Sequence, residues 1–79
     1  MPGKSASALD RYVSEKVRAR RKEIGMTQQA LASSIGVTFQ QLQKYEKGTN
    51  RISAGRLLTI ARVLKMPVAR FFDGAPDNP

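Results

Sequence analysis

The chain has 79 residues, which predicts one small domain, and it contains neither cysteine nor histidine. This composition excludes disulfides, zinc sites with the usual ligands and a histidine general base. Fourteen lysines and arginines against six acidic residues give a net charge of +8. That charge favours DNA, RNA or an anionic membrane surface as the partner, over a charge that serves solubility alone.

Targeting signals are not evident in the sequence. No apolar run approaches the ~20 residues that a membrane-spanning helix needs. The N-terminal stretch MPGKSASALD also lacks the apolar core of a secretion signal. We therefore expect a cytoplasmic, nucleoid-associated protein with no membrane partner.

The chain begins with a polar stretch and a first helix. Residues 1–8 are small or polar apart from Met1 and predict a flexible lead. An arm lying on DNA is the alternative, which the absence of an arginine cluster disfavours. A first helix is expected over Leu9–Ile24, capped by Ser7 or Asp10 and stopped by a glycine at position 25. Its apolar stripe consists of Leu9, Tyr12, Val13, Val17 and Ile24.

Two short helices are expected next, with a glycine between them. Thr27 is a suitable N-cap for a helix of about eight residues that ends at Gly36. Thr38 is a suitable N-cap for a third helix, Phe39–Lys47, which Gly48 closes. The third helix is rich in glutamine.

The last third of the chain predicts two more helices. A fourth helix is expected after Ser53, and Pro67 both ends it and suits the first turn of a short fifth helix, Val68–Phe72. The buried face of the fourth helix is expected to comprise Ile52, Leu57, Leu58, Ile60, Ala61 and Leu64. Residues 74–79 carry no core-forming side chain and predict a flexible tail. No strand pattern occurs, so we expect an all-α, compact five-helix bundle over residues 9–73.

Four residues define how the second and third helices pack. Ala32 is a small residue at the place where two steeply crossing helices approach each other, and Gly36 allows a sharp turn between them. Leu42 and Tyr45 are apolar anchors on the inner face of the third helix. This spacing predicts a helix-turn-helix whose third helix, about residues 38–47, exposes an outer face that fits a major groove.

Three segments carry a resemblance to a known family. They are RARRKEIGMTQQALASSIGV, TFQQLQKYEKGTNRIS and LLTIARVL, followed by the FF pair. Residues 13–72, roughly three quarters of the chain, resemble the lambdoid phage repressor and Cro type of helix-turn-helix, and most of all the bacterial XRE family of regulators. The resemblance implies a lambda-repressor-like domain whose second and third helices contact DNA.

The resemblance also implies roles for individual residues. Base contacts are implied for Thr38, Phe39, Gln40, Gln41 and Lys44. Phosphate contacts are implied for Arg21, Thr27, Gln28, Gln43, Lys47, Asn50 and Arg51. Arg21 is further implied to pair with Glu46, which would hold the third helix against the first. The alternative is two unrelated surface charges.

The chemistry of these side chains agrees with the implied roles. A glutamine pairs bidentately with adenine N6 and N7, and Lys44 donates to guanine O6 and N7. The Thr38 methyl group or the Phe39 ring can lie against a thymine methyl group. Phe39 has a second interpretation, in which it packs beside the first helix.

The other aromatic and basic residues are assigned to the core or to the surface. Tyr45 is interpreted as a core residue. One of Phe71 and Phe72 is expected to close the core, and the other to lie in a dimer contact. A solvated face of the last two helices is expected to carry Arg56, Arg62 and Arg70.

The function that these features favour is sequence-specific binding of double-stranded DNA by a transcriptional regulator, as a homodimer on a palindromic operator. The alternative is a protein-interaction module, such as an antitoxin or anti-regulator, that uses Phe39 and the Phe71–Phe72 end. RNA binding is disfavoured because no aromatic platform for single-stranded bases is present. No nucleophile–base pair, metal-ligand cluster or glycine-rich phosphate loop occurs, so we expect no enzyme activity, metal or cofactor.

Overall fold

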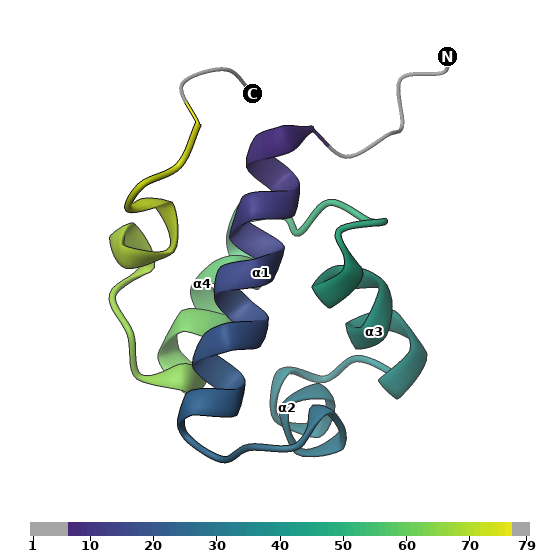
Figure 1. Ribbon diagram of the computed structural model, residues 1–79. Helices are drawn as coiled ribbons and strands as arrows, with labels where there is room; N and C mark the ends of the chain where they lie inside the picture. The colour runs from purple at the N-terminus through teal and green to yellow at the C-terminus, as the bar shows by residue number, and fades with distance from the viewer. Residues whose placement is uncertain (1–6, 77–79) are drawn as a thin grey trace.

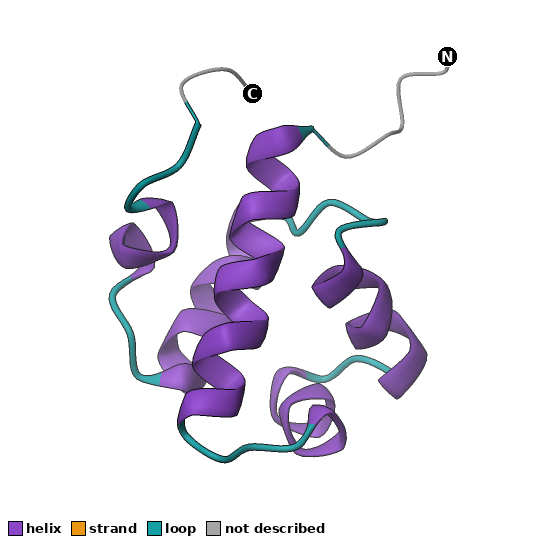
Figure 2. Cartoon of the chain, viewed as in Figure 1, coloured by secondary structure: helices purple, strands orange, loops and turns teal. Residues whose placement is uncertain are grey.

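Helices are the only regular elements of residues 7–76, which are the residues that the computed structural model describes (Figures 1 and 2). In chain order they are α1 (Ala8–Glu23), α2 (Gln28–Ile35), α3 (Phe39–Lys47), α4 (Ala54–Leu64) and the 3₁₀ helix η1 (Val68–Phe72). The predicted all-α class is therefore confirmed. None of these helices is long and apolar enough to cross a membrane. Most of the expected flexible lead and tail, residues 1–6 and 77–79, lies outside the described residues.

The prediction of five α-helices is wrong in its last element. Val68–Phe72 is a 3₁₀ helix, with hydrogen bonds from Arg70 N to Pro67 O (2.9 Å) and from Asp73 N to Arg70 O (3.3 Å). No side chain caps its start, and the backbone is extended again at Asp73. Five residues between a proline and an extended residue are too few to offset the cost of nucleating an α-helix, whereas a 3₁₀ turn suits so short a segment.

The first helix begins one residue earlier than expected. Ser7 Oγ accepts a hydrogen bond from Asp10 N (3.1 Å), and Asp10 Oδ2 accepts one from Ser7 N (3.0 Å), so the two residues form a capping box. The helix ends at Glu23. Ile24 therefore lies beyond the last turn and is 39 % exposed, and its predicted place in the apolar stripe is wrong.

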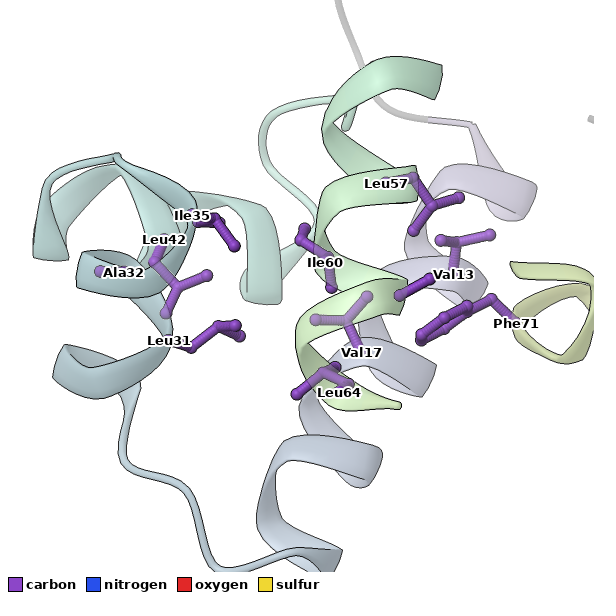
Figure 3. Packing of buried hydrophobic residues seen from close by; sticks show 11 residues of the cluster. Val13, Val17, Leu31, Ala32, Ile35, Leu42, Leu57, Ile60, Leu64 and Phe71 are labelled. Carbon is purple, nitrogen blue, oxygen red and sulfur yellow. The ribbon is translucent and has the colours of Figure 1, made fainter. Parts of the chain in front are cut away.

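Apolar side chains from every helix form one core, shown in Figure 3. Phe71 is fully buried and reaches from η1 toward Val13, whereas Phe72 is exposed, so the prediction that one of the two closes the core is confirmed. Leu58 was expected on the buried face of α4 but is 43 % exposed. It lies one residue, or about 100° of helix rotation, from the buried Leu57 and faces outward. The buried apolar residues are Val13, Val17, Leu31, Ala32, Ile35, Leu42, Leu57, Ile60, Ala61, Leu64 and Phe71.

The turn between α2 and α3 has the caps that the sequence predicts. The hydroxyl oxygens of Thr27 and Thr38 accept hydrogen bonds from the backbone N–H groups of Ala30 and Gln41, both at 3.0 Å. Gly36 has a φ of 76° and a ψ of 32°. This left-handed conformation ends α2 and allows the chain to turn into α3.

Two arginines connect helix ends to neighbouring helices. Arg56 Nη1 donates to Ile35 O at the end of α2 (2.6 Å), so its predicted place on a solvated face is wrong. Arg20 donates through Nε to Leu64 O (2.9 Å) and through Nη2 to Lys65 O (3.2 Å) at the end of α4. The last carbonyls of a helix have no partner within it, and a cationic donor satisfies them.

Candidate nucleic-acid interface

One face of α3 is turned to solvent, because the helix lies at the edge of the molecule and packs against α1 and α2 on its inner side (Figure 1). On the inner side, Leu42 and Glu46 are buried, and Tyr45 is half-buried against the core. Gln41 and Gln43 are half-buried at the margins. The exposed residues of α3 are Phe39, Gln40, Lys44 and Lys47.

The start of α3 gathers residues for which base contacts were expected. Thr38 is exposed, and its hydroxyl oxygen accepts the capping hydrogen bond, which leaves its methyl group and its hydroxyl hydrogen for other contacts. Phe39 is 38 % exposed, so its ring is not part of the buried core. Gln40 and Lys44 are four residues apart and share one side of the helix. An apolar group therefore lies beside two hydrogen-bonding groups on one small surface.

A buried carboxylate connects three helices behind that surface. Glu46 of α3 accepts hydrogen bonds from Arg21 of α1, at 2.6 Å (Nε to Oε2) and 3.0 Å (Nη2 to Oε1). It also accepts one from Gln28 Nε2 of α2 at 3.0 Å. The Arg21 and Glu46 side chains are only 8 % and 2 % exposed. The pair that the resemblance implies is thus a buried ion pair in the structure, and it fixes α3 against α1.

This network changes what Arg21 and Gln28 offer to DNA. Arg21 is buried, and its remaining nitrogen, Nη1, donates to Met26 O (2.8 Å), so all three of its nitrogens have partners within the protein and none is left for a phosphate. Gln28 is half-buried and has a second amide hydrogen beyond the one that Glu46 accepts. The first backbone N–H groups of α2 have no partner within the helix and favour an anion. Thr27 is exposed at the same end.

The end of α3 and the loop after it carry three exposed residues of the predicted site: Lys47, the last residue of α3, then Asn50 and Arg51. Arg51 Nε donates to Asp10 Oδ2 (3.1 Å), while 68 % of the Arg51 side chain stays exposed. Burial alone raises the pKa of Asp10, but the Ser7 backbone N–H, the Arg51 guanidinium and the Ser7 hydroxyl outweigh it and hold this pKa below its ordinary value of 3.8. Asp10 is therefore ionised at neutral pH and pairs with the Arg51 guanidinium.

Two contacts of this site were not foreseen in the sequence. The Gln28–Glu46 and Asp10–Arg51 hydrogen bonds join residues 18 and 41 positions apart. The Gln28–Glu46 contact had a signal in the sequence, because a buried carboxylate that pairs with one arginine still has lone pairs for another donor. The Asp10–Arg51 contact had no signal, because the capping role of Asp10 explained its position without a distant partner.

Comparisons with known proteins agree with this geometry. A family model of helix-turn-helix domains, HTH_3, matches residues 17–71. The chain belongs to this helix-turn-helix family. The resemblance to XRE-type regulators inferred from the sequence is thereby confirmed.

Relatives with curated names share the domain at high identity. An uncharacterized HTH-type transcriptional regulator of Sinorhizobium medicae is 49 % identical over 75 residues, which are 95 % of this chain and 54 % of that protein. An uncharacterized transcriptional regulator in the ATPase CF(0) region of Rhodospirillum rubrum is 52 % identical over 64 residues, 81 % of this chain and 59 % of that protein. The chain therefore spans about half the length of the curated relatives it matches.

Solved structures share the fold. The clp gene regulator ClgR from Corynebacterium glutamicum matches with a TM-score of 0.81 at 24 % identity, over 85 % of this chain and 87 % of that chain. The wild-type restriction-modification controller protein C.Esp1396I matches with a TM-score of 0.76 at 26 % identity, over 86 % of this chain and 88 % of that chain. The arrangement of helices is thus that of helix-turn-helix proteins.

Proposed function

We propose that this domain is the DNA-binding part of a transcriptional regulator that recognises double-stranded DNA sequence-specifically with α3 in the major groove. The observation that carries the proposal is the solvent-facing side of α3, which the buried Glu46 network holds in place. The net charge of +8 and the names of the relatives support it. Its place of action is then the nucleoid, in the cytoplasm.

Base recognition is assigned to the exposed side of α3. Gln40 pairs with an adenine and Lys44 with a guanine, and each such pair discriminates against a wrong base by about 1–3 kcal/mol. Thr38 and Phe39 contact a thymine methyl group. Gln41 is half-buried and contributes from the margin of this surface.

The DNA backbone is held on both sides of α3, and these contacts set register and affinity without reading sequence. The start of α2 contributes Gln28, whose free amide hydrogen and backbone N–H meet one phosphate. The loop after α3 contributes Arg51, which pairs with Asp10 through Nε. The full set of proposed phosphate contacts is Thr27, Gln28, Gln43, Lys47, Asn50 and Arg51.

We further propose that the regulator is a homodimer on a palindromic operator, joined through an apolar groove of about 420 Å³ between the start of α1, α4 and η1. Leu58, Val68 and Phe72 line it and are 38–43 % exposed, and they are three of the five large apolar side chains exposed among the described residues. Two chains of charge +8 repel each other, and burial of apolar surface at the contact offsets that repulsion. Asp10, which pairs with Arg51, is the one charged residue that the structure describes in the lining of this groove, so the same apolar face of a second copy fits it.

Titration with random-sequence duplex at two salt concentrations tests the proposed function. Each phosphate contact contributes about −0.9 to the slope of log K against log salt concentration, so binding is expected to weaken steeply as salt rises. Absence of salt-dependent binding would contradict the proposal and favour the protein-interaction module, such as an antitoxin or anti-regulator.

A further inference from the structure

A carboxylate lies beside one of the cations proposed to contact the DNA backbone. The loop after α3 passes the start of α1 on its way to α4 (Figure 1), and there Arg51 Nε donates to Asp10 Oδ2 at 3.1 Å. By charge alone, Asp10 repels a phosphate that approaches Arg51 and weakens the binding of DNA. The geometry of the pair indicates the opposite effect.

The backbone around Arg51 is held on both sides by hydrogen bonds and packing. Before it, the backbone N–H and the hydroxyl group of Thr49 both donate to Lys44 O at 3.1 Å. After it, Ile52 packs against the core and Ser53 caps the start of α4. The conformational freedom of this position therefore lies in the long Arg51 side chain, which is 68 % exposed.

Asp10 offers Arg51 an acceptor that is itself held in place. Its Oδ2 also accepts hydrogen bonds from Ser7 N and Ser7 Oγ, both at 3.0 Å, and its side chain is only 19 % exposed. The Ser7–Asp10 contacts form the capping box of α1, so the helix start sets the position of the carboxylate. Arg51 is therefore bound to a group with a defined position.

The pair leaves the outer edge of the Arg51 guanidinium for a ligand. Asp10 accepts from Nε, and neither Nη1 nor Nη2 takes part in a hydrogen bond found among residues 7–76. Two N–H groups in one plane match two oxygens of a phosphate. A long side chain loses conformational freedom when it binds a ligand, and this loss is smaller where a neighbouring group already holds the side chain.

We propose that Asp10 is a positioning residue for DNA binding, whose carboxylate holds Arg51 in the orientation in which Nη1 and Nη2 meet a backbone phosphate. The inference rests on the proposed function, in which Arg51 contacts the DNA backbone. It deepens that function because it gives an acidic residue a favourable role in the binding of a polyanion. Asp10 does not touch DNA and acts through Arg51.

The test measures the affinity of Asp10→Asn for random-sequence duplex at one fixed salt concentration. This substitution removes the charge but keeps an oxygen that accepts from Ser7, so the cap of α1 is retained. Asp10→Asn is expected to bind about two- to fivefold more weakly than the wild type, which is the range for the loss of an exposed ion pair. Urea unfolding under the assay conditions shows that each variant compared is folded.

Glu15→Gln is the matched control, because it removes the same charge from the same helix. Glu15 is exposed, and none of the ion pairs found within residues 7–76 involves it. Its removal acts through charge alone, so Glu15→Gln is expected to bind duplex at least as tightly as the wild type.

A double-mutant cycle with Arg51→Gln separates positioning from a structural role. In the Arg51→Gln background, Asp10→Asn is expected to cause no loss of affinity, because no guanidinium is left to orient. The salt slope is a second measurement, and Arg51→Gln lowers its magnitude by about 0.9 if one phosphate contact is lost. The slope of Asp10→Asn is expected to lie between those of Arg51→Gln and the wild type.

An unchanged or increased affinity of Asp10→Asn would overturn the inference, and so would an equal loss in the presence and absence of Arg51. Either result leaves the proposed function standing in a wild-type chain whose binding weakens steeply with salt. An Arg51→Gln variant that binds like the wild type would overturn both the inference and the phosphate contact assigned to Arg51. Failure of the wild-type chain to bind duplex would overturn the proposed function and this inference together.

Discussion

Glu46 connects three helices, since donors from α1 and α2 both converge on its carboxylate in α3. A buried carboxylate is costly to desolvate and persists only when its lone pairs are satisfied. Among residues 7–76, no buried side-chain nitrogen or oxygen lacks a partner. The orientation of α3 therefore depends on a charge pair at its C-terminal end as well as on Leu42.

Glu46→Gln is expected to lower the free energy of unfolding by about 3–5 kcal/mol, because it leaves the Arg21 guanidinium buried without a counter-charge. Urea denaturation at pH 7 measures it. Glu23→Gln is the matched control: Glu23 forms an exposed ion pair with Arg20 at 3.0 Å, and its loss is expected to change stability by less than about 1 kcal/mol. Equal effects of the two substitutions would contradict a structural role for the buried pair.

Asp10 predicts a pH-dependent contribution to stability. Its folded-state pKa lies below the ordinary 3.8, so the unfolded chain takes up a proton at higher pH than the folded chain. The stabilisation is therefore fully present above about pH 3.8 and is lost as the pH falls through the lowered value. Asp10→Asn keeps an oxygen that accepts from Ser7 but removes the charge. The wild type is expected to have a higher free energy of unfolding in urea than Asp10→Asn, by the same amount from pH 7 to pH 5, and this difference should disappear at lower pH. A difference that persists at pH 2 would refute this.

At the residue scale, the sequence was informative where a side chain acts locally or within a recognised motif. The threonine caps follow from neighbours three residues away, and the Arg21–Glu46 pair follows from the resemblance. The contacts of Gln28 with Glu46 and of Arg51 with Asp10 depend on the angles at which helices dock, and periodicity does not encode these angles.

At the scale of elements, α1 and α3 are in close contact where α3 ends. Gly48 has a φ of 77°, and a Cβ there would lie 2.8 Å from Arg11 Cγ. The glycine therefore serves both the left-handed cap and the helix contact.

Gly48→Ala is expected to destabilise the domain by about 1–2 kcal/mol, from the left-handed backbone together with the contact against Arg11. Gly55→Ala provides a contrast, because Gly55 lies in α4 with no atom within 4 Å of an added Cβ and without a positive φ. That change should stabilise the domain by up to about 1 kcal/mol. Thermal unfolding measures the melting temperature of both variants relative to the wild type. Changes of the same sign in the two variants would contradict the role assigned to Gly48.

Element boundaries were predictable because strong caps and glycines mark them, and the starts of α2, α3 and α4 fall where Thr27, Thr38 and Ser53 place them. The type of the last element was not predictable from Pro67 alone, because the apolar pattern of five residues fits an α-helix and a 3₁₀ helix equally well. Leu58 was misplaced for a related reason. Its neighbour Leu57 is buried, and two adjacent leucines do not show which of them lies on the buried face of the helix.

At the scale of the whole molecule, the apolar groove at α4 and η1 predicts a dimer. Phe72→Ser is expected to shift the chain from dimer to monomer in sedimentation velocity, because it removes a large apolar side chain from the contact. Phe39→Ser is the matched control, since Phe39 is similarly exposed but lies on α3 and is expected to leave the dimer intact. A wild-type chain that sediments as a monomer at high concentration would contradict the dimer surface.

The central claim is that the exposed side of α3 reads DNA sequence, and selection of duplexes from a random pool tests it most directly. The wild-type chain is expected to enrich an inverted repeat with half-sites about one helical turn apart. Gln40→Ala should enrich the same spacing with relaxed preference at one position of each half-site, and should cost about 1–3 kcal/mol of affinity for the wild-type site. No enrichment by the wild-type chain, or an identical selected motif for Gln40→Ala, would contradict the account.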